Sequence, residues 1–441
     1  MFRRKAYEEL KKWKESYAGK YAALLEGARR VGKTTIAEAF AKNEYKSYIK
    51  IDFSVAGDDI KGLFSQIQDL DLLFLRIQNL FGVTLYPRKS CILLDEIQFC
   101  PRARQAIKHL VKDGRYDYIE TGSLISIRKN VKDILIPSEE YKIQVRPMDY
   151  EEWNWAIGKD YGLLRQAYQR KEDTQSLNPT LLRDFRLYMA VGGMPQAVEA
   201  YISKKNFQAV EFAKSEIISL YENDFMKIDS SGRMSRLYQA IPGQLSLGRK
   251  RFVISSVLQK KKTAKAEELL NDLLDSKTVL ACREVKDPSI AFSLTMDVDA
   301  FKLYCADTGL FVSLMLRGNE TKIYDKLLDD RLDVNLGYLY ENMVAQMIVA
   351  SGRSLCYHTF PKNGGTHYYE VDFLLNLDGA LYPVEVKSSS HMKHASLDAF
   401  LGKYSQRSKR GFIISHKPYR VNGDVEYIPI YFLPFLLEGQ S

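Results

Sequence analysis

The stretch of the sequence most suited to chemistry is an eight-residue run from Gly27 to Thr34, which reads GARRVGKT. It matches a pattern of two glycines separated by four residues and followed by Lys and then Ser or Thr. Glycines let backbone N–H groups curl around phosphate oxygens, and a helix that begins there adds the positive end of its dipole. Lys33 can reach the β- and γ-phosphates of a nucleotide, and the Thr34 hydroxyl can bind Mg²⁺.

The flanks of this run favour a phosphate-binding loop over a turn that matches the pattern by chance. Residues 21–26 predict a short apolar strand, and residues 34–42 predict a helix with Ile36 and Phe40 on one face. Strand, loop and helix in that order are the context that the pattern requires. We therefore expect ATP to contact a set of loop residues: Gly27, Ala28, Arg29, Arg30, Val31, Gly32, Lys33, Thr34 and Thr35.

A second group of polar residues follows the apolar run 91–94, about sixty residues after the loop. Asp95 at the end of that strand is suited to hold Mg²⁺ directly or through water. Glu96 is suited to orient or deprotonate the attacking water. Thr121 and Ser123 end the next predicted strand, where a hydroxyl can contact the γ-phosphate or, as an equal alternative, cap the following helix.

The elements that must position these residues alternate between strands and helices. Strands are predicted over 46–54, 91–96, 116–123 and 141–145, with helices over 58–81 and 103–113. This alternation predicts an α/β fold with a parallel sheet between helices.

The last part of the chain carries another set of chemically suited residues. A helix predicted over 336–350 contains Glu341, a strand over 368–376 contains Asp372, and a strand over 381–387 contains Glu385 and Lys387. The three acids predict an oxygen-ligand site for Mg²⁺, and Lys387 is suited to position water or stabilise phosphoryl charge, as in phosphodiester hydrolysis. The alternative is an exposed strand face in which Glu385 and Lys387 simply form an ion pair.

Charge in this region favours a polyanionic partner. From Lys387 to Arg420 inclusive there are eight Lys or Arg residues and a single acid, Asp398. Such a stretch is typical of binding to the DNA backbone without sequence readout. A plain solvated face is the alternative.

Length and composition predict a soluble cytoplasmic protein of several domains. The 441 residues carry a net charge of +9 and five scattered cysteines without a C-x-x-C pair, which is typical of reduced thiols. No window of about 18 uninterrupted apolar residues predicts a membrane span, and no apolar segment follows the basic start as in a secretory signal. The sequence leaves open whether the chain forms a homo-oligomer.

We predict four domains. They are an ATPase core over 1–158, a helical lid over 159–232, a winged-helix-like unit over 233–325 and an α/β nuclease-like domain over 326–441. The winged-helix-like prediction rests on two short helices followed by a β-hairpin, with the basic run at 260–262 between the helices.

The chain resembles a prokaryotic family of two-part ATPases with an amino-terminal AAA-type ATPase domain and a carboxy-terminal domain of unknown function, DUF4143. The stretches that carry the resemblance are GARRVGKTT (27–35), LLDEIQ (93–98), ETGS (120–123), VGGMPQAV (191–198), FKLYCADTGL (301–310), YEVDFLL (369–375) and YPVEVK (382–387). The resemblance implies a Walker A motif at 27–35, a Walker B motif at Asp95 and Glu96, and a sensor-like residue near Thr121 or Ser123.

The same resemblance implies that the tail is similar to the restriction-endonuclease-like fold of PD-(D/E)xK enzymes. By that likeness, Glu341, Asp372, Glu385 and Lys387 fall on nuclease positions, and this chain keeps all four. It assigns no arginine finger, for which Arg102, Arg104, Arg115 and Arg128 are candidates.

The leading hypothesis is an ATPase that couples its nucleotide state to a DNA-associated, nuclease-like tail. One alternative is a nucleotide-gated switch or scaffold whose tail keeps a nuclease-like shape without cutting. A third hypothesis, with less support, is a transporter-associated or signalling ATPase that does not contact nucleic acid.

Overall fold

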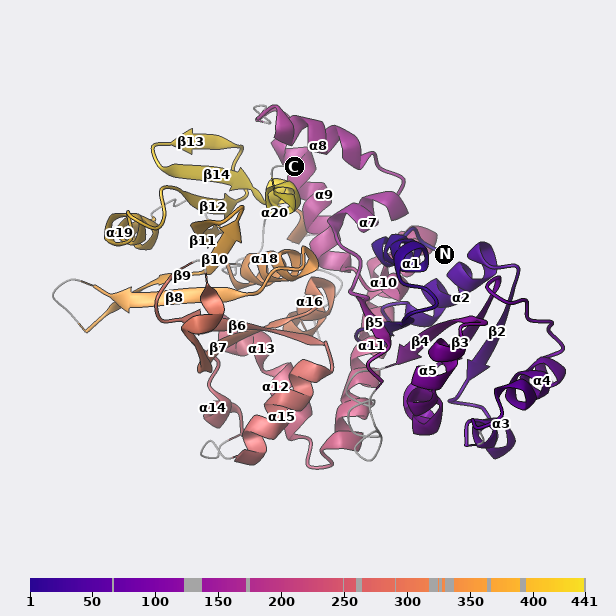
Figure 1. Cartoon of the computed structure of the whole chain (residues 1–441). Coiled ribbons are helices and arrows are strands. Elements are labelled where there is room, and N and C mark those ends of the chain that lie inside the picture. Colours follow the sequence, from indigo (N-terminus) through magenta and orange to yellow (C-terminus); the bar gives the residue numbers. More distant parts are fainter. Residues whose placement is uncertain are drawn as a thin grey trace. The chain divides into compact units, whose positions relative to one another are not determined.

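The computed structural model contains two compact units (Figure 1). Unit 1 comprises residues 1–146 with 275–277, and unit 2 comprises 147–274 with 278–441. The structure describes residues 1–65, 67–122, 137–171, 175–248, 250–258, 264–289, 291–316, 324, 327–329, 337–362, 366–388 and 394–439. Within those residues, no helix is long and apolar enough to span a bilayer.

Unit 1 is built on a five-stranded sheet in which every neighbouring pair of strands is parallel. Its strands are β1 (Ala22–Glu26), β2 (Ser47–Asp52), β3 (Ser90–Asp95), β4 (Asp117–Gly122) and β5 (Glu140–Gln144). Their spatial order is β2-β3-β4-β1-β5. The predicted α/β fold with a parallel sheet is confirmed, and the carboxyl ends of β1, β3 and β4 lie at one edge.

The helices of unit 1 bury apolar side chains against this sheet. They are α1 (Lys5–Ser16), α2 (Lys33–Glu44), α3 (Asp58–Leu63), α4 (Leu70–Phe81), the 3₁₀ turn η1 (Ile97–Phe99) and α5 (Pro101–Asp113). The single helix predicted over 58–81 is wrong, because the chain forms two helices there. The Asp69 side chain accepts a hydrogen bond from the Leu72 amide and so caps the start of α4.

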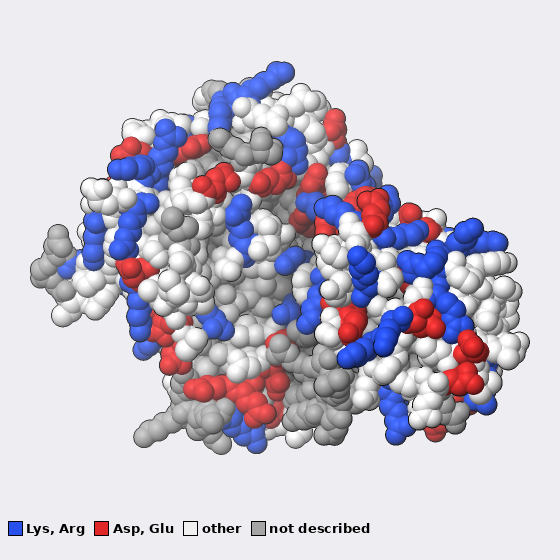
Figure 2. Space-filling view, in the orientation of Figure 1, with Lys and Arg blue, Asp and Glu red and all other residues white. Residues whose placement is uncertain are grey.

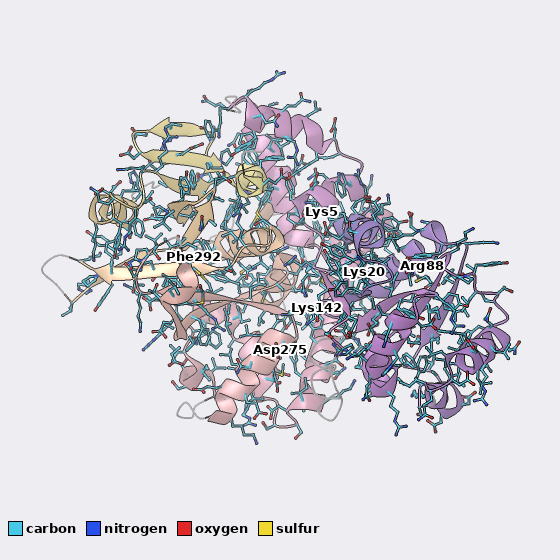
Figure 3. All side chains as sticks on the ribbon, in the orientation of Figure 1. Lys5, Lys20, Arg88, Lys142, Asp275 and Phe292 are labelled. Atoms are coloured by element: carbon cyan, nitrogen blue, oxygen red, sulfur yellow. The ribbon has the colours of Figure 1, made fainter. Side chains whose placement is uncertain are left out.

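Charged groups also occur inside unit 1, beside the strand ends. Arg104 of α5 makes a buried bidentate ion pair with Glu140 at 2.7 and 2.8 Å. Lys142 of β5 (Figure 3) lies 3.8 Å from the Glu26 carboxylate at the end of β1. Arg104 is therefore held within the unit, whereas Arg102 is exposed.

Unit 2 contains two sheets. The five-stranded sheet, in the order β10-β11-β12-β14-β13, is formed by β10 (Phe373–Leu377), β11 (Ala380–Lys387), β12 (Gly411–Ser415), β13 (Arg420–Asn422) and β14 (Val425–Pro429). The four-stranded sheet, in the order β7-β6-β8-β9, is formed by β6 (Val279–Val285), β7 (Met296–Cys305), β8 (Cys356–Pro361) and β9 (Tyr368–Val371). This second sheet joins strands from both sides of residue 325, and the four-domain division itself stays a prediction.

The strand predicted over 368–376 is wrong in one respect. It is two strands, because the chain leaves one sheet after Val371 and enters the other at Phe373. Asp372 therefore lies at the point where the chain changes sheets. Asp378 and Gly379, both at positive φ, form the turn between β10 and β11.

Most of the remaining chain in unit 2 is helical. Its helices are α7 (Tyr150–Ala156), α8 (Tyr161–Gln169), α9 (Asn178–Val191), α10 (Pro195–Lys204), α11 (Phe207–Ile228), α12 (Arg233–Gln239), α13 (Ile241–Ser246), α14 (Ile254–Leu258), α16 (Thr308–Leu316), α18 (Gly337–Ala350), α19 (Ala395–Lys403) and α20 (Leu433–Glu438), with 3₁₀ turns η2 (Phe292–Leu294) and η3 (Ile430–Phe432). Helix α15 (Ala264–Asp275) ends at the first residue of the 275–277 segment. The basic run 260–262 lies outside the described residues.

Two of the stretches that carry the family resemblance meet in unit 2. The Asp307 carboxylate accepts hydrogen bonds from the Gly193 amide at 2.6 Å and the Leu310 amide at 2.9 Å. A Cβ atom on Gly193 would lie 2.1 Å from the Met148 carbonyl oxygen, and one on Gly309 would lie 2.4 Å from the Val191 carbonyl oxygen. Glycine is thus required at 309, where the ends of α9 and α16 approach closely, and at 193, where the segment after α9 passes the backbone at Met148.

Candidate functional site

The loop between β1 and α2 has a backbone that only glycine can supply at two positions. Gly27 has φ of 158°, and a Cβ atom there would lie 2.1 Å from the Val145 carbonyl oxygen. Gly32 precedes α2 in the left-handed region, with φ of 95°. Arg30 also has a positive φ, of 71°, which is uncommon for a residue with a side chain.

Lys33 lies inside this loop. It is 8% exposed, and its Nζ donates hydrogen bonds to the carbonyl oxygens of Gly27 at 3.0 Å and Ala28 at 2.9 Å. Burial lowers the pKa of Lys33 to about 8, although the negative charges of Glu96 and Asp95 oppose the shift. The loop thus holds the ammonium group in place, and an anion arriving there would favour its charged form.

Asp95 connects this loop to the neighbouring strands. Its Oδ1 accepts hydrogen bonds from the Thr34 hydroxyl, at 2.7 Å, and from the Thr121 hydroxyl. The Thr121 oxygen in turn accepts a hydrogen bond from the Glu96 amide at 3.3 Å. The two predicted magnesium ligands, Thr34 of α2 and Asp95 of β3, thus lie in contact. A hydroxyl oxygen beside a carboxylate oxygen is the kind of ligand pair that Mg²⁺ prefers.

Glu96 and Thr35 do not contact Asp95 Oδ1 through their side chains in the way that Thr34 and Thr121 do. Glu96 has a left-handed backbone, with φ of 52°, and its carboxylate accepts a hydrogen bond from the Gln98 side chain. Thr35 is exposed on α2. Ser123 and Arg128 lie outside the described residues.

Lys50 on β2 is a further charged residue at this site, and no sequence motif identifies it. Its Nζ lies 2.9 Å from Glu38 Oε2 and 3.7 Å from Asp95 Oδ2, so a second ammonium group lies beside the predicted magnesium ligand. Its local sequence gives little signal, because Lys50 lies on the less buried side of a strand whose burial alternates. Its relevance depends on the pairing of β2 with β3, which the sequence does not reveal.

A second cluster of charged residues lies in unit 2. Lys302 of β7 makes ion pairs with Glu341 of α18, at 2.8 Å, and with Glu370 of β9, at 2.6 Å. Burial, followed by the negative charge of Glu341, raises the pKa of Asp372 to about 8. Asp372 and Glu341, both predicted as metal ligands, therefore lie close together. Lys302 and Glu370 belong to the same cluster, although no motif in the sequence identifies them.

The other two predicted residues of this cluster belong to β11. Glu385 Oε2 pairs with Lys387 Nζ at 2.7 Å, and Glu385 Oε1 accepts a hydrogen bond from the Leu397 amide at 2.8 Å. Burial alone would lower the pKa of Lys387, but Glu385 outweighs it and raises that pKa. An ion pair between Glu385 and Lys387 is the contact predicted by the alternative interpretation, in which these residues do not form a nuclease site.

The predicted metal ligands of the tail make contacts with the chain itself. Glu341 Oε1 accepts hydrogen bonds from Lys302 and Tyr304, and Asp372 Oδ2 accepts one from the Val386 amide at 2.8 Å. Within the described ranges, no three or more His, Cys, Asp and Glu side chains are arranged to hold a metal ion. The chemistry of this cluster is thus that of carboxylates already paired with protein donors.

Basic side chains of the tail are exposed but not uniformly free. Lys403, Lys409 and Arg410 are exposed. Arg407 contacts the Asp287 carboxylate, and the Arg420 guanidinium lies 4.0 Å from the centre of the Tyr427 ring. Figure 2 shows lysine and arginine side chains interspersed with acidic ones on the face in view.

Comparison with known protein families finds three models that match successive parts of the chain. A model described as an AAA domain matches residues 19–154 and so includes the loop, Asp95 and Thr121. A domain of unknown function, DUF8612, matches residues 182–321, and another, DUF4143, matches residues 336–433. No curated protein sequence matches the chain. The chain therefore carries an AAA domain followed by a DUF4143 domain, as the sequence resemblance implies.

Proposed function

We propose that the protein binds ATP with Mg²⁺ at the loop 27–35 and hydrolyses it. The observation that carries the proposal is the pair of hydrogen bonds from Thr34 and Thr121 to Asp95 Oδ1, next to a lysine buried inside a glycine-bounded loop. The match of residues 19–154 to an AAA domain supports it.

Each residue has a role in this proposal. Backbone N–H groups of the loop hold the phosphates, and Lys33 stabilises charge that develops on the γ-phosphate. Thr34 and Asp95 would hold Mg²⁺, which supplies further neutralisation of phosphate charge. Glu96 would accept a proton from the attacking water, after its carboxylate leaves Gln98. Ser123 is proposed as a further γ-phosphate contact.

Substitution of Glu96 separates binding from chemistry. We expect Glu96→Gln to keep ATP affinity and to lower kcat by about 100-fold or more, the usual contribution of a general base. Steady-state phosphate release and equilibrium ATP binding measure the two effects. Glu15→Gln is the control, because Glu15 is exposed on α1 and that change retains the carboxylates of Asp95 and Glu96. A Glu96→Gln protein with a normal turnover rate would remove Glu96 from the mechanism.

For the tail, we propose a nucleic-acid-associated domain with a nuclease-like shape. Its support is the basic composition of 387–420 and the exposure of Lys403, Lys409 and Arg410. Binding of labelled duplex DNA should weaken steeply with salt and should weaken further in the double variant Lys409→Ala/Arg410→Ala. Absence of binding at low salt would reject this role and leave the ATPase proposal intact.

The cytoplasmic location is also a proposal. All five cysteines are buried free thiols, which suits a reducing compartment.

A further inference from the structure

The charged cluster of unit 2 draws its members from separate elements. The negative members are Glu341 (α18), Glu370 (β9), Asp372 (between β9 and β10) and Glu385 (β11), and the positive members are Lys302 (β7) and Lys387 (β11). Glu385 is buried and the other three carboxylates are partly buried, so cations are needed among them, because an unpaired buried charge is strongly destabilising. Lys387 pairs with Glu385, so the remaining acids depend on Lys302.

The position of Lys302 allows its ammonium group to interact with all three of those acids. It is 5% exposed, and its Nζ contacts both Glu341 Oε1 and Glu370 Oε1. These two ion pairs, at 2.8 and 2.6 Å, place the Lys302 ammonium group between carboxylates from α18 and β9.

Neighbouring side chains hold Lys302 in this position. Tyr304, two residues later on the same strand, donates a hydrogen bond to the same Glu341 oxygen. Residues two apart on a strand share a face, so β7 presents both groups to α18. The Tyr357 ring centre lies 5.6 Å from Lys302 Nζ, within the range of a cation–π contact.

The remaining predicted ligands also have donors from the chain. Asp372 Oδ2 accepts from the Val386 amide, and Glu385 accepts from the Leu397 amide and Lys387. A divalent cation between Glu341 and Asp372 would meet the ammonium of Lys302 at short range in a buried setting, where repulsion between like charges is large.

We infer that Lys302 is the resident cation of this cluster, taking the place that a divalent metal has in a nuclease-like site. The carboxylates of the tail then accept ion pairs or hydrogen bonds from the chain itself, and the tail binds neither Mg²⁺ nor Mn²⁺. This inference rests on the nuclease-like interpretation of the tail and is independent of the proposed ATPase.

Mn²⁺ binding to the full chain tests the inference. Every protein in the test carries Asp95→Asn and is free of nucleotide, so that the loop of unit 1 does not contribute a metal site. Electron paramagnetic resonance measures the number of Mn²⁺ ions bound per protein chain in a solution that contains millimolar Mn²⁺. We expect no bound Mn²⁺ in the parent protein and one bound ion in Lys302→Met, where the carboxylates have lost their counterion. Adding Asp372→Asn to Lys302→Met should remove that ion.

Two matched variants serve as controls. Lys302→Arg keeps the positive charge and should bind no Mn²⁺. Lys286→Met removes an exposed lysine whose ion pair with Asp297 lies near the same strands, and it should also bind none.

Two results would overturn the inference. One is Mn²⁺ binding by the parent protein that Asp372→Asn abolishes, which would mean that metal and Lys302 coexist. The other is a folded Lys302→Met protein that binds no Mn²⁺. If Lys302→Met does not fold, the parent protein and its Asp372→Asn variant still decide the question. ATP turnover is measured separately, in chains that keep Asp95. Failure of the ATPase proposal can therefore be distinguished from failure of this inference.

Discussion

At the scale of single residues, Asp95 is the group on which the proposed ATP site depends. One of its oxygens accepts from two hydroxyls, and the other faces Lys50. Thr34 and Asp95 were predictable, because each follows from a motif and its spacing. The contacts of Thr121 and Lys50 with Asp95 depend on which strands lie next to β3, and that order is set by the fold.

Thr121→Val tests the hydroxyl that joins Asp95 to the Glu96 backbone. Valine keeps the shape of the side chain but removes the hydrogen bonds, and a hydrogen bond to a charged group contributes about 1.5–3 kcal/mol. If these bonds are needed in the transition state, kcat should fall by about 10- to 100-fold with little change in KM. Thr121→Ser keeps the hydroxyl and should restore most of the rate. Equal rates for Thr121→Val and wild type would exclude this role.

Lys50→Met tests the second ammonium group. Because Lys50 lies 3.7 Å from Asp95 Oδ2, its positive charge opposes a metal ion at that carboxylate. We expect Lys50→Met to lower the Mg²⁺ concentration that gives half-maximal ATP turnover, by about 3-fold or more. Lys42→Met, on the exposed side of α2, should leave that concentration unchanged. An increase in the required Mg²⁺ would show that Lys50 helps to assemble the site.

At the scale of elements, the structure departs from sequence expectation where a strand or helix is interrupted. The helices α3 and α4 contact the same hydrophobic core, and their apolar residues follow one continuous helical spacing. That spacing alone therefore predicts a single helix. The capping residue Asp69 was the local signal for the break. Alternation likewise continues across Asp372, and the change of sheet depends on pairing with β8 and then β11, which are distant in sequence.

Gly193→Ala tests the close approach of the segment after α9 to the backbone at Met148. The added methyl group would lie 2.1 Å from the Met148 carbonyl oxygen, so backbone must move. We expect the unfolding free energy of unit 2 to fall by about 2 kcal/mol or more, as for other severe overpacking. Gly402→Ala, within α19, has open space at the added methyl group and should be neutral or stabilising by up to about 1 kcal/mol. Denaturant unfolding compares the two, and a tolerated Gly193→Ala would refute the packing argument.

At the scale of the whole molecule, the charged clusters described in the two compact units differ in character. Unit 1 places hydroxyls and a carboxylate beside the loop 27–35, whereas unit 2 places a lysine between carboxylates. If the protein couples nucleotide state to its tail, ATP must change unit 2 as well as unit 1.

Hydrogen–deuterium exchange measures that coupling. With Glu96→Gln, which should bind ATP without turnover, we expect Mg²⁺ and ATP to slow exchange in α2 and β3 of unit 1. A smaller change should follow in the strands of unit 2. The same chain with Lys33→Ala should show neither effect. Protection confined to unit 1 would contradict coupling but not ATP binding.

The central claim is that the loop 27–35 holds the phosphates of ATP with Lys33 at its centre. Its most direct test is equilibrium binding of ATP in Mg²⁺ by isothermal titration calorimetry, for wild type, Lys33→Ala and Lys42→Ala. The last variant removes an exposed lysine from the same helix. We predict that wild type and Lys42→Ala bind equally and that Lys33→Ala binds at least about 10-fold more weakly, as expected for loss of a charge-assisted contact. Wild-type protein that does not bind ATP, or equal binding by Lys33→Ala, would contradict the account.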